Sequence, residues 1–290
     1  MSDRGAVICD VDGTLAERDQ PVNSSVAAAL AEVADAGWRV MILTGQPLNN
    51  ISQRLLPVLR VAFRHLPSCL HALRVLTCEG AGAWHIGLDN CVPVRMPGEA
   101  TINIPEEDRN LVTRLLRTEL VSVCPGSVRV LEPPIWHEGA MCVFKLDTQG
   151  EARRLVAAQL LELFRQHGLD SLRVGLGGTF SIVITHRLVH KGNALAGIVE
   201  SLGLGEWAFY LADEFMGDGN DTHALRVRDL VCLDFSRPGS GLTGHGPPAA
   251  AQWLRHLANL SNARETPTEE IAGRLYKKQS ESQINLPCVK

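Results

Sequence analysis

Short apolar runs alternate along this chain with segments in which apolar residues recur every three or four positions. The run Ala6–Cys9 predicts a buried strand, and the run Arg39–Leu43 predicts a second one. Between them, residues 24–36 carry apolar side chains at helical spacing, and Gly37 is expected to end that helix. This strand–helix–strand unit predicts two parallel neighbouring strands with a right-handed crossover.

The same alternation of predicted strands and helices continues to residue 82 and resumes after residue 189. The further predicted elements are a helix over 48–60, a strand over Leu73–Cys78, a helix over Asn193–Leu202, strands over Trp207–Ala212 and Leu230–Asp234, and a helix over Pro248–Leu260. Alternating strands and helices are typical of an α/β fold with a Rossmann-like parallel sheet.

Residues 83–188 follow a different pattern. It predicts weak strands at Trp84–Ile86 and Val92–Val94, a helix from Pro105 to Val121, strands over Val128–Leu131 and Ala140–Leu146, a helix over Gly150–His167, and a hairpin of Leu172–Val174 with Phe180–Thr185. That order is typical of an α+β unit with an antiparallel sheet. The sequence therefore predicts a core domain of residues 1–82 and 189–260, an inserted α+β cap domain of residues 83–188, and a mobile polar tail over 261–290.

Composition narrows the class of protein. The chain of 290 residues is 45% hydrophobic and 21% charged, which is typical of a soluble globular protein. The net charge of -4 carries no polybasic signature, so neither nucleic acid nor an anionic membrane is an expected partner. The eight cysteines form no CxxC pair, which favours reduced thiols over disulfides or a zinc site. Since the sequence also shows no signal-peptide pattern and no membrane-spanning run, we expect a cytoplasmic protein.

Polar side chains follow three predicted strands of the core. Asp10 and Asp12 come one residue apart after the first strand, so they are expected to share a face beyond its carboxyl end. Thr44 follows the second strand, and Asp213 follows the strand that ends at Ala212. Ligand sites of open parallel sheets lie beyond the carboxyl ends of strands, so these groups are expected to converge. Neighbouring acids repel unless a cation or a shared proton relieves them, and a divalent metal with a phosphate suits the pair.

Each of these signals has a simpler interpretation when it stands alone. Asp10 and Asp12 beside a turn glycine could cap a helix or bind calcium, and Thr44 could be an ordinary strand-end residue. Lys191, just before a helix, could be a solvent-exposed residue at the start of that helix. Together they fit phosphoryl chemistry, because Thr44 and the backbone N–H groups after it suit a phosphoryl oxygen and Lys191 would offset the carboxylates.

The segment 213–221 is a second acidic centre. A solvated acidic loop is the simpler interpretation, but this loop follows a buried strand whose end faces the expected ligand site. Asp213 is the expected additional metal ligand, while Asp218, Asn220 or Asp221 would hold a metal-bound water or orient Lys191. A site made only of oxygen ligands fits Mg²⁺ better than zinc.

Four motifs in this order resemble those of the haloacid dehalogenase-like (HAD) hydrolase superfamily: Asp10-Val-Asp12-Gly-Thr-Leu, Thr44-Gly45, Lys191-Gly192 and the acidic loop Asp213 to Asp221. The inserted module resembles the large α+β (C2B-type) cap of one subgroup. That subgroup holds sucrose-phosphate, trehalose-phosphate and mannosylglycerate-phosphate phosphatases, Cof-type sugar phosphatases and phosphomannomutase. One departure is Gln46, where the subgroup often has arginine.

The resemblance implies a Mg²⁺-dependent phosphatase that hydrolyses a sugar phosphate or similar small phosphomonoester through an aspartyl-phosphate. Asp10 would be the nucleophile, and Asp12 would protonate the leaving alcohol and then deprotonate water. Thr44, Gly45 and Lys191 would hold the phosphoryl oxygens. The implied metal ligands are the Asp10 and Asp213 carboxylates and the Asp12 backbone carbonyl, with Asp218, Asn220 and Asp221 around them.

The cap is expected to select the substrate. Trp136 could stack on a sugar ring and Glu138 could accept hydroxyl hydrogen bonds, and Lys145 and Gly178 are further candidates; an exposed loop with a partly buried tryptophan is the simpler interpretation. Two other functions stay open. The long spacing of the acidic loop is phosphomannomutase-like, which suggests a phosphotransferase, and the scaffold could also serve a catalytically silent sugar-phosphate-binding protein. The oligomeric state is not predicted.

Overall fold

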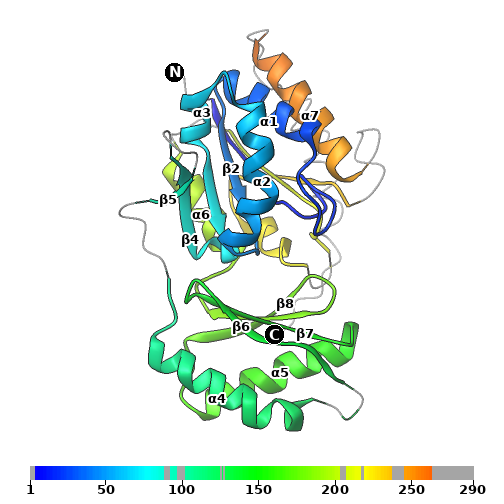
Figure 1. Cartoon of the computed structure of the whole chain (residues 1–290). Coiled ribbons are helices and arrows are strands. Elements are labelled where there is room, and N and C mark those ends of the chain that lie inside the picture. Colours follow the sequence, from blue (N-terminus) through cyan, green and yellow to red (C-terminus); the bar gives the residue numbers. More distant parts are fainter. Residues whose placement is uncertain are drawn as a thin grey trace.

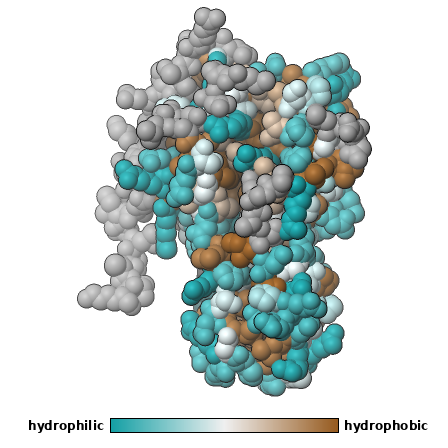
Figure 2. All heavy atoms as spheres, turned by 90° about the vertical axis from the view of Figure 1, so that its left-hand side faces the viewer, coloured by the Kyte–Doolittle hydropathy of each residue, from teal (hydrophilic) through white to brown (hydrophobic). Residues whose placement is uncertain are grey.

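The computed structural model describes residues 4–87, 92–96, 102–124, 126, 128–202, 207–216, 219–236 and 245–262. Figure 1 shows two layered parts, a larger one built on a seven-stranded sheet and a smaller one built on a four-stranded sheet. In the space-filling view of Figure 2 these parts form two lobes, and hydrophobic side chains are visible where the lobes meet. The predicted α/β class, with a mostly parallel sheet, is confirmed.

The seven-stranded sheet has the order β11-β10-β1-β2-β3-β4-β5. Its parallel strands are β1 (Gly5–Cys9), β2 (Arg39–Leu43), β3 (Arg74–Thr77), β10 (Trp207–Ala212) and β11 (Val231–Asp234), and its antiparallel strands are β4 (Gly82–Ile86) and β5 (Pro93–Arg95). Strand β1 pairs with both β2 and β10, and Cys9 lies opposite Ile42 and Leu211. The chain winds outward from β1 in both directions, so the ends of β1, β2 and β10 meet at the switch point of the sheet.

Helices cover both faces of this sheet. On one face lie α1 (Ser24–Asp35), α2 (Leu48–Ala62), α3 (Pro67–Ala72) and α7 (Gly246–Asn262), and on the other lies α6 (Lys191–Ser201) (Figure 1). The alternation of β1 explains this arrangement. Val7 and Cys9 pack into the cluster that includes α1 and α7, whereas Ala6 and Ile8 pack with Leu195 of α6.

The four-stranded sheet is antiparallel and has the order β6-β7-β9-β8. Its strands are β6 (Val130–His137), β7 (Met141–Leu146), β8 (Leu172–Gly177) and β9 (Ser181–His186), and the helices are α4 (Glu106–Val123) and α5 (Gly150–Gln166). These helices lie on the far side of the sheet, where they share an apolar cluster that includes Phe144 and Ile182. The opposite face of the sheet is turned toward the ends of the core strands (Figure 1).

Three predicted boundaries differ from the structure. The cap start predicted at residue 83 is too early, because β4 and β5 extend the core sheet by antiparallel pairing on β3. The strand predicted over Val128–Leu131 lies further along the chain, because β6 runs from Val130 to His137. Helix α7 continues past residue 260, and buried Ser261 accepts a hydrogen bond of 2.8 Å from Trp38 Nε1. The rest of the predicted tail, from residue 263, lies outside the described residues.

Two short 3-10 turns complete the described core, Cys78–Gly80 after β3 and Thr222–Arg226 after the acidic loop. Within the described ranges, no helix combines the length and apolar character that a bilayer crossing needs.

Candidate active site

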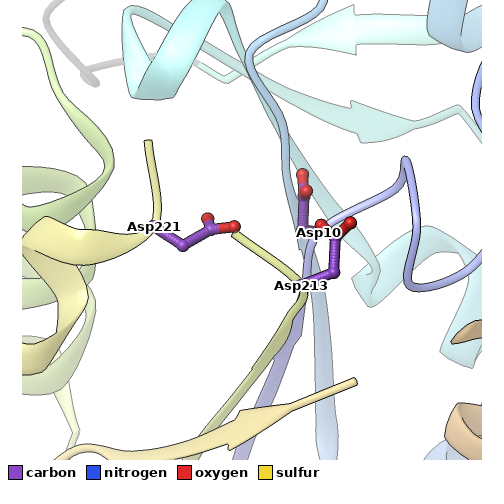
Figure 3. Close-up of side chains that lie close together, drawn as sticks. All are labelled: Asp10, Asp213 and Asp221. Atoms are coloured by element: carbon purple, nitrogen blue, oxygen red, sulfur yellow. The ribbon is translucent and has the colours of Figure 1, made fainter. Parts of the chain in front are cut away.

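Three carboxylates meet beyond the ends of two neighbouring strands. Asp10 follows β1, Asp213 follows β10, and Asp221 comes from the loop beyond Asp213. One carboxylate oxygen from each lies within 4.8 Å of the others, and Figure 3 shows the Asp10 and Asp213 side chains close together with Asp221 pointing toward them. The predicted convergence of the strand ends is thus present in the folded chain.

Burial and mutual repulsion disfavour the ionised forms of these acids. Burial raises the pKa of Asp10 to about 8, with Asp221 and Asp213 adding to the rise while Lys191 opposes it. Burial also raises the pKa of Asp213 to about 7, helped by Glu214 and Asp221 and opposed by Lys191 and Arg18. A further positive charge would allow both groups to ionise.

Lys191 is the buried cation of the site. It begins α6, and its Nζ lies 3.0 Å from Asp10 Oδ1 and 2.7 Å from Asp221 Oδ1. Although burial lowers the pKa of Lys191, the Asp10 and Asp221 carboxylates raise it above its usual value overall. The two carboxylates therefore favour the charged ammonium, which lies against the carboxylate of Asp10.

Asp221 holds this lysine in place. Besides Lys191, its carboxylate accepts hydrogen bonds from the hydroxyl of Tyr210 and from the backbone N–H of Glu214. All three donors come from different elements, so the Asp221 side chain has one fixed orientation. Its contacts match the predicted orienting partner of Lys191, and Tyr210 is a partner that the sequence did not indicate.

The oxygen atoms at this end of the sheet fit a hard cation. Asp213 Oδ1 and Asn220 Oδ1 are both buried without a hydrogen-bond partner in the described part of the chain, which is costly unless something else satisfies them. Gly13, at a φ of +77°, permits a close approach: a Cβ there would lie 1.9 Å from Asp213 Oδ2. Oxygen-only donors of this kind suit Mg²⁺. Asp218, another predicted member of this group, lies outside the described residues.

The turn after β2 offers hydrogen-bond groups beside these acids. Thr44 is buried, its N–H donates to Leu76 O at 3.0 Å, and its Oγ1 accepts from Gln46 N–H at 3.1 Å. A Cβ on Gly45 would lie 3.5 Å from Asn220 Nδ2, so this turn faces the acidic loop. Gly45, predicted to bind phosphate, therefore lies close to Asn220 of the acidic loop.

Asp12 lies apart from the three-carboxylate cluster. Its Oδ1 is 2.7 Å from Arg54 Nη2 and accepts a hydrogen bond of 3.1 Å from Asp19 N–H, and its Oδ2 accepts from the amide of Gln46. Gln46 stands where the related subgroup often has arginine, and here α2 supplies the cation as Arg54. The sequence reasoning missed Arg54, because its position in an amphipathic helix gives no sign of a carboxylate partner.

The four predicted substrate residues of the cap are not all brought together. Trp136 and Glu138 line one pocket of about 700 Å³ together with residues of α2, and neither Lys145 nor Gly178 lines it. Trp136 Nε1 donates to Thr113 Oγ1 of α4 at 2.9 Å, so its indole packs toward the cap helices. Glu138 binds the core, accepting from Leu48 N–H at 2.6 Å and from Thr77 Oγ1 at 3.1 Å.

The other two candidates lie outside that pocket. Lys145 is exposed and pairs with Glu132 at 3.0 Å. Gly178 lines a pocket of about 360 Å³ that includes Asp213, Glu214 and Arg153. Among the four, Gly178 is the residue that shares a pocket with the acidic cluster.

Comparisons with known proteins agree with this architecture. Residues 7–61 match a family model described as haloacid dehalogenase-like hydrolase. No curated protein sequence matches the chain. The structure is similar to that of an IMP-bound Plasmodium falciparum IMP-nucleotidase mutant, with a TM-score of 0.62 and 13% sequence identity over 88% of this chain and 67% of that one.

Two further solved structures are similar. A trehalose-6-phosphate phosphatase related protein has a TM-score of 0.53 and 17% identity, covering 90% of this chain and 100% of the other. Trehalose-6-phosphate phosphatase of Aspergillus fumigatus has a TM-score of 0.54 and 14% identity, covering 88% and 93%. At such identities the structures establish a shared fold. They confirm the predicted fold class, and the match of residues 7–61 agrees with the predicted superfamily and hydrolase class.

Proposed function

Taking the chain as a haloacid dehalogenase-like hydrolase, we propose that it is a Mg²⁺-dependent phosphatase of a sugar phosphate or similar small phosphomonoester. The observation that carries this proposal is the position of Lys191, which bridges Asp10 and Asp221. Asp213 Oδ1 and Asn220 Oδ1 are buried and have no hydrogen-bond partner among the described residues. Phosphoryl transfer to an aspartate requires a nucleophilic carboxylate, a cation in a fixed position and oxygen atoms that are available to bind a metal ion.

The metal would be held by the carboxylates of Asp10 and Asp213 and by the backbone carbonyl of Asp12. Asp221 has a carboxylate oxygen within 4.8 Å of those of Asp10 and Asp213, and Asn220 precedes it in the chain. When bound, Mg²⁺ supplies positive charge that neutralises the phosphoryl oxygens. The same charge would offset the Asp10 and Asp213 carboxylates, whose pKa values are raised by burial.

The residues of the chain then have distinct roles. The Asp10 carboxylate attacks phosphorus, the bond from phosphorus to the leaving oxygen breaks, and an aspartyl-phosphate forms. Asp12 gives its proton to the leaving oxygen and later takes one from the water that attacks phosphorus. The bond between phosphorus and the Asp10 oxygen then breaks, so that inorganic phosphate leaves and the Asp10 carboxylate is restored. Lys191, the Thr44 hydroxyl and the backbone N–H of Gly45 hold the phosphoryl oxygens. Most of the rate gain comes from this positioning and charge complementarity.

The substrate class rests on the cap and on the proteins of similar fold. The four-stranded sheet faces the acidic site, and the pocket beside Asp213 has room for a small leaving group. The similar structures are named for action on IMP and trehalose 6-phosphate, both small phosphomonoesters. We therefore propose a hydroxyl-rich phosphomonoester as the substrate.

A panel of sugar phosphates and nucleoside monophosphates, with Mg²⁺ and inorganic phosphate release as the readout, tests the proposal. We expect release from at least one substrate without an activating bisphosphate, and none from purified, folded Asp10→Asn protein. An active Asp10→Asn protein would overturn the assignment of the nucleophile. Dependence on a bisphosphate with return of phosphate to the sugar would favour a mutase, and inactivity across the panel would favour a silent binding protein.

A further inference from the structure

The turn Cys78–Gly80 is wedged between two phosphate-binding elements. Cys78 N–H donates to Gln46 O at 3.0 Å and Glu79 N–H donates to Thr44 O at 2.9 Å, so the turn clamps both ends of the Thr44–Gln46 segment. On its other side, a Cβ on Gly80 would lie 2.5 Å from the Cβ of Ala194, in the helix that begins with Lys191. The position of this turn therefore fixes the spacing of both elements.

The backbone of the turn is in an unfavourable conformation. Cys78 and Glu79 have φ values of +50° and +60°, in the left-handed region that residues with a side chain rarely adopt. Such a conformation persists when surrounding contacts over-determine it, and it occurs most often at functional sites. The two backbone hydrogen bonds to Thr44 and Gln46 are part of that support.

The remaining support comes from the cap. The Glu79 side chain is buried, and its carboxylate pairs with the guanidinium of Arg173 in β8. Leu172, Val174 and Leu176 of β8 pack into the cap cluster, so the alternation of the strand turns Arg173 toward the core. Burial raises the pKa of Glu79, and Arg173 counteracts the rise. The buried carboxylate thus has its cation while β8 lies over the core.

The same guanidinium also reaches the connection that leads to Lys191. Arg173 Nε donates to Thr185 Oγ1 of β9 at 2.9 Å, and Thr185 Oγ1 donates to Val189 O at 3.3 Å. Val189 precedes His190 and Lys191 in the chain. One arginine of the cap therefore contacts the turn that clamps Thr44 directly, through Glu79, and reaches the segment that ends at Lys191 through Thr185.

We propose that Arg173 and Glu79 are positioning residues that couple the closed position of the cap to the assembly of the phosphate-binding groups. This inference rests on the proposed phosphatase function. Neither side chain carries a reacting group. Arg173 acts through Glu79 on the Thr44–Gln46 segment and through Thr185 on the segment before Lys191, so the phosphate-binding groups are fully aligned only under a closed cap.

Kinetics of Arg173→Gln and Glu79→Gln provide the first test. We expect kcat to fall about 10- to 100-fold for each, with KM for a small phosphomonoester changed less than about threefold, because alignment and not substrate contact is lost. Arg173→Lys should keep more activity than Arg173→Gln, and the double variant should be no slower than either single one. Arg154→Gln, in an exposed ion pair with Glu151 on α5, is the matched control.

The proposed coupling would be wrong if the factor by which kcat falls in the double variant equalled the product of the two single factors. It would also be wrong if kcat of each single variant stayed within about twofold of wild type. Should Arg173→Gln fail to fold, Arg173→Lys and Glu79→Gln carry the same comparison.

Amide hydrogen exchange of the full chain provides a test that needs no activity. In Arg173→Gln, peptides spanning 44–46 and 78–80 should exchange faster than in wild type, and in Arg154→Gln they should not. If wild type released no phosphate from any substrate, the proposed phosphatase function would be wrong. The exchange result would still test whether Arg173 orders the two segments. Unchanged exchange in both segments would overturn the inference.

Discussion

The Nζ of Lys191 lies 2.7 Å from Oδ1 of Asp221, and neither side chain is accessible to solvent. Removing one partner of such a buried pair leaves an uncompensated charge. We expect Asp221→Asn to lower the free energy of unfolding by about 3 kcal/mol and kcat by at least about tenfold, because Lys191 loses the partner that aims it at Asp10. Urea unfolding and phosphate release measure the two effects. Asp229→Asn, in an exposed pair with Arg228, should change neither; an unaltered Asp221→Asn protein would contradict the role of this pair.

Asp213→Asn separates stability from metal binding. The Asp213 carboxylate is destabilised by burial and by Glu214 and Asp221, so the amide should leave the metal-free protein at least as stable as wild type, and up to about 2 kcal/mol more stable. Wild type should gain thermal stability on adding Mg²⁺, because a ligand that binds the native state stabilises it, whereas Asp213→Asn should gain little. Melting curves with EDTA and with Mg²⁺ give both quantities. Equal Mg²⁺ stabilisation of the two proteins would argue against Asp213 as a ligand.

His190 makes stability depend on pH. Burial lowers the pKa of this imidazole to about 4, with His223 and Arg173 adding to the decrease, whereas an unfolded histidine titrates near about 6.5. Between those values the unfolded chain binds more protons than the native one, so stability is lost as pH falls from about 6.5 toward about 4. His190→Asn keeps an acceptor for the Asn193 N–H, which His190 Nδ1 accepts at 3.2 Å, but does not titrate.

We therefore expect the melting temperature of wild type to drop more between pH 7 and pH 5 than that of His190→Asn. The exposed His167 gives the control, since His167→Asn should follow the wild-type profile. If the melting temperatures of wild type and His190→Asn fell in parallel, a group other than His190 would dominate the loss of stability at low pH.

The core of the site could be predicted because its residues follow strands. Asp10, Thr44 and Asp213 come directly after apolar runs. Parallel strands have their carboxyl ends at the same edge of the sheet, so these residues meet regardless of how the other segments fold. Partners such as Arg54 and Tyr210 lie in the interior of a helix or a strand. Nothing in their local spacing marks a contact with Asp12 or Asp221, because those contacts form through tertiary packing.

The cap was harder to predict because strand β6 is irregular. Its pairing with β7 shifts register between Val130 and Glu132 and again between Glu132 and Ile135, where two prolines interrupt the strand. Each shift changes which residues share a face, so the sequence alone cannot decide on which side Trp136 lies. The sequence likewise predicts that β4 and β5 belong to the cap, since an antiparallel extension of a parallel sheet has the same local pattern as a separate antiparallel unit.

A substitution of Glu138 can show whether this residue attaches the cap to the core or binds the substrate. Its carboxylate accepts a hydrogen bond of 2.6 Å from Leu48 N–H at the start of α2, where an anion is favoured by the unpaired N–H groups, and a second of 3.1 Å from Thr77 Oγ1. Glu138→Gln weakens this attachment of cap to core, so we expect kcat/KM to fall by the same factor, about tenfold, for every phosphomonoester whether or not its leaving group carries hydroxyls. Glu132→Gln, in an exposed pair with Lys145, is the control and should be neutral. A loss confined to hydroxyl-rich substrates would instead assign Glu138 to substrate recognition, because a direct hydrogen bond affects only the substrates that make it.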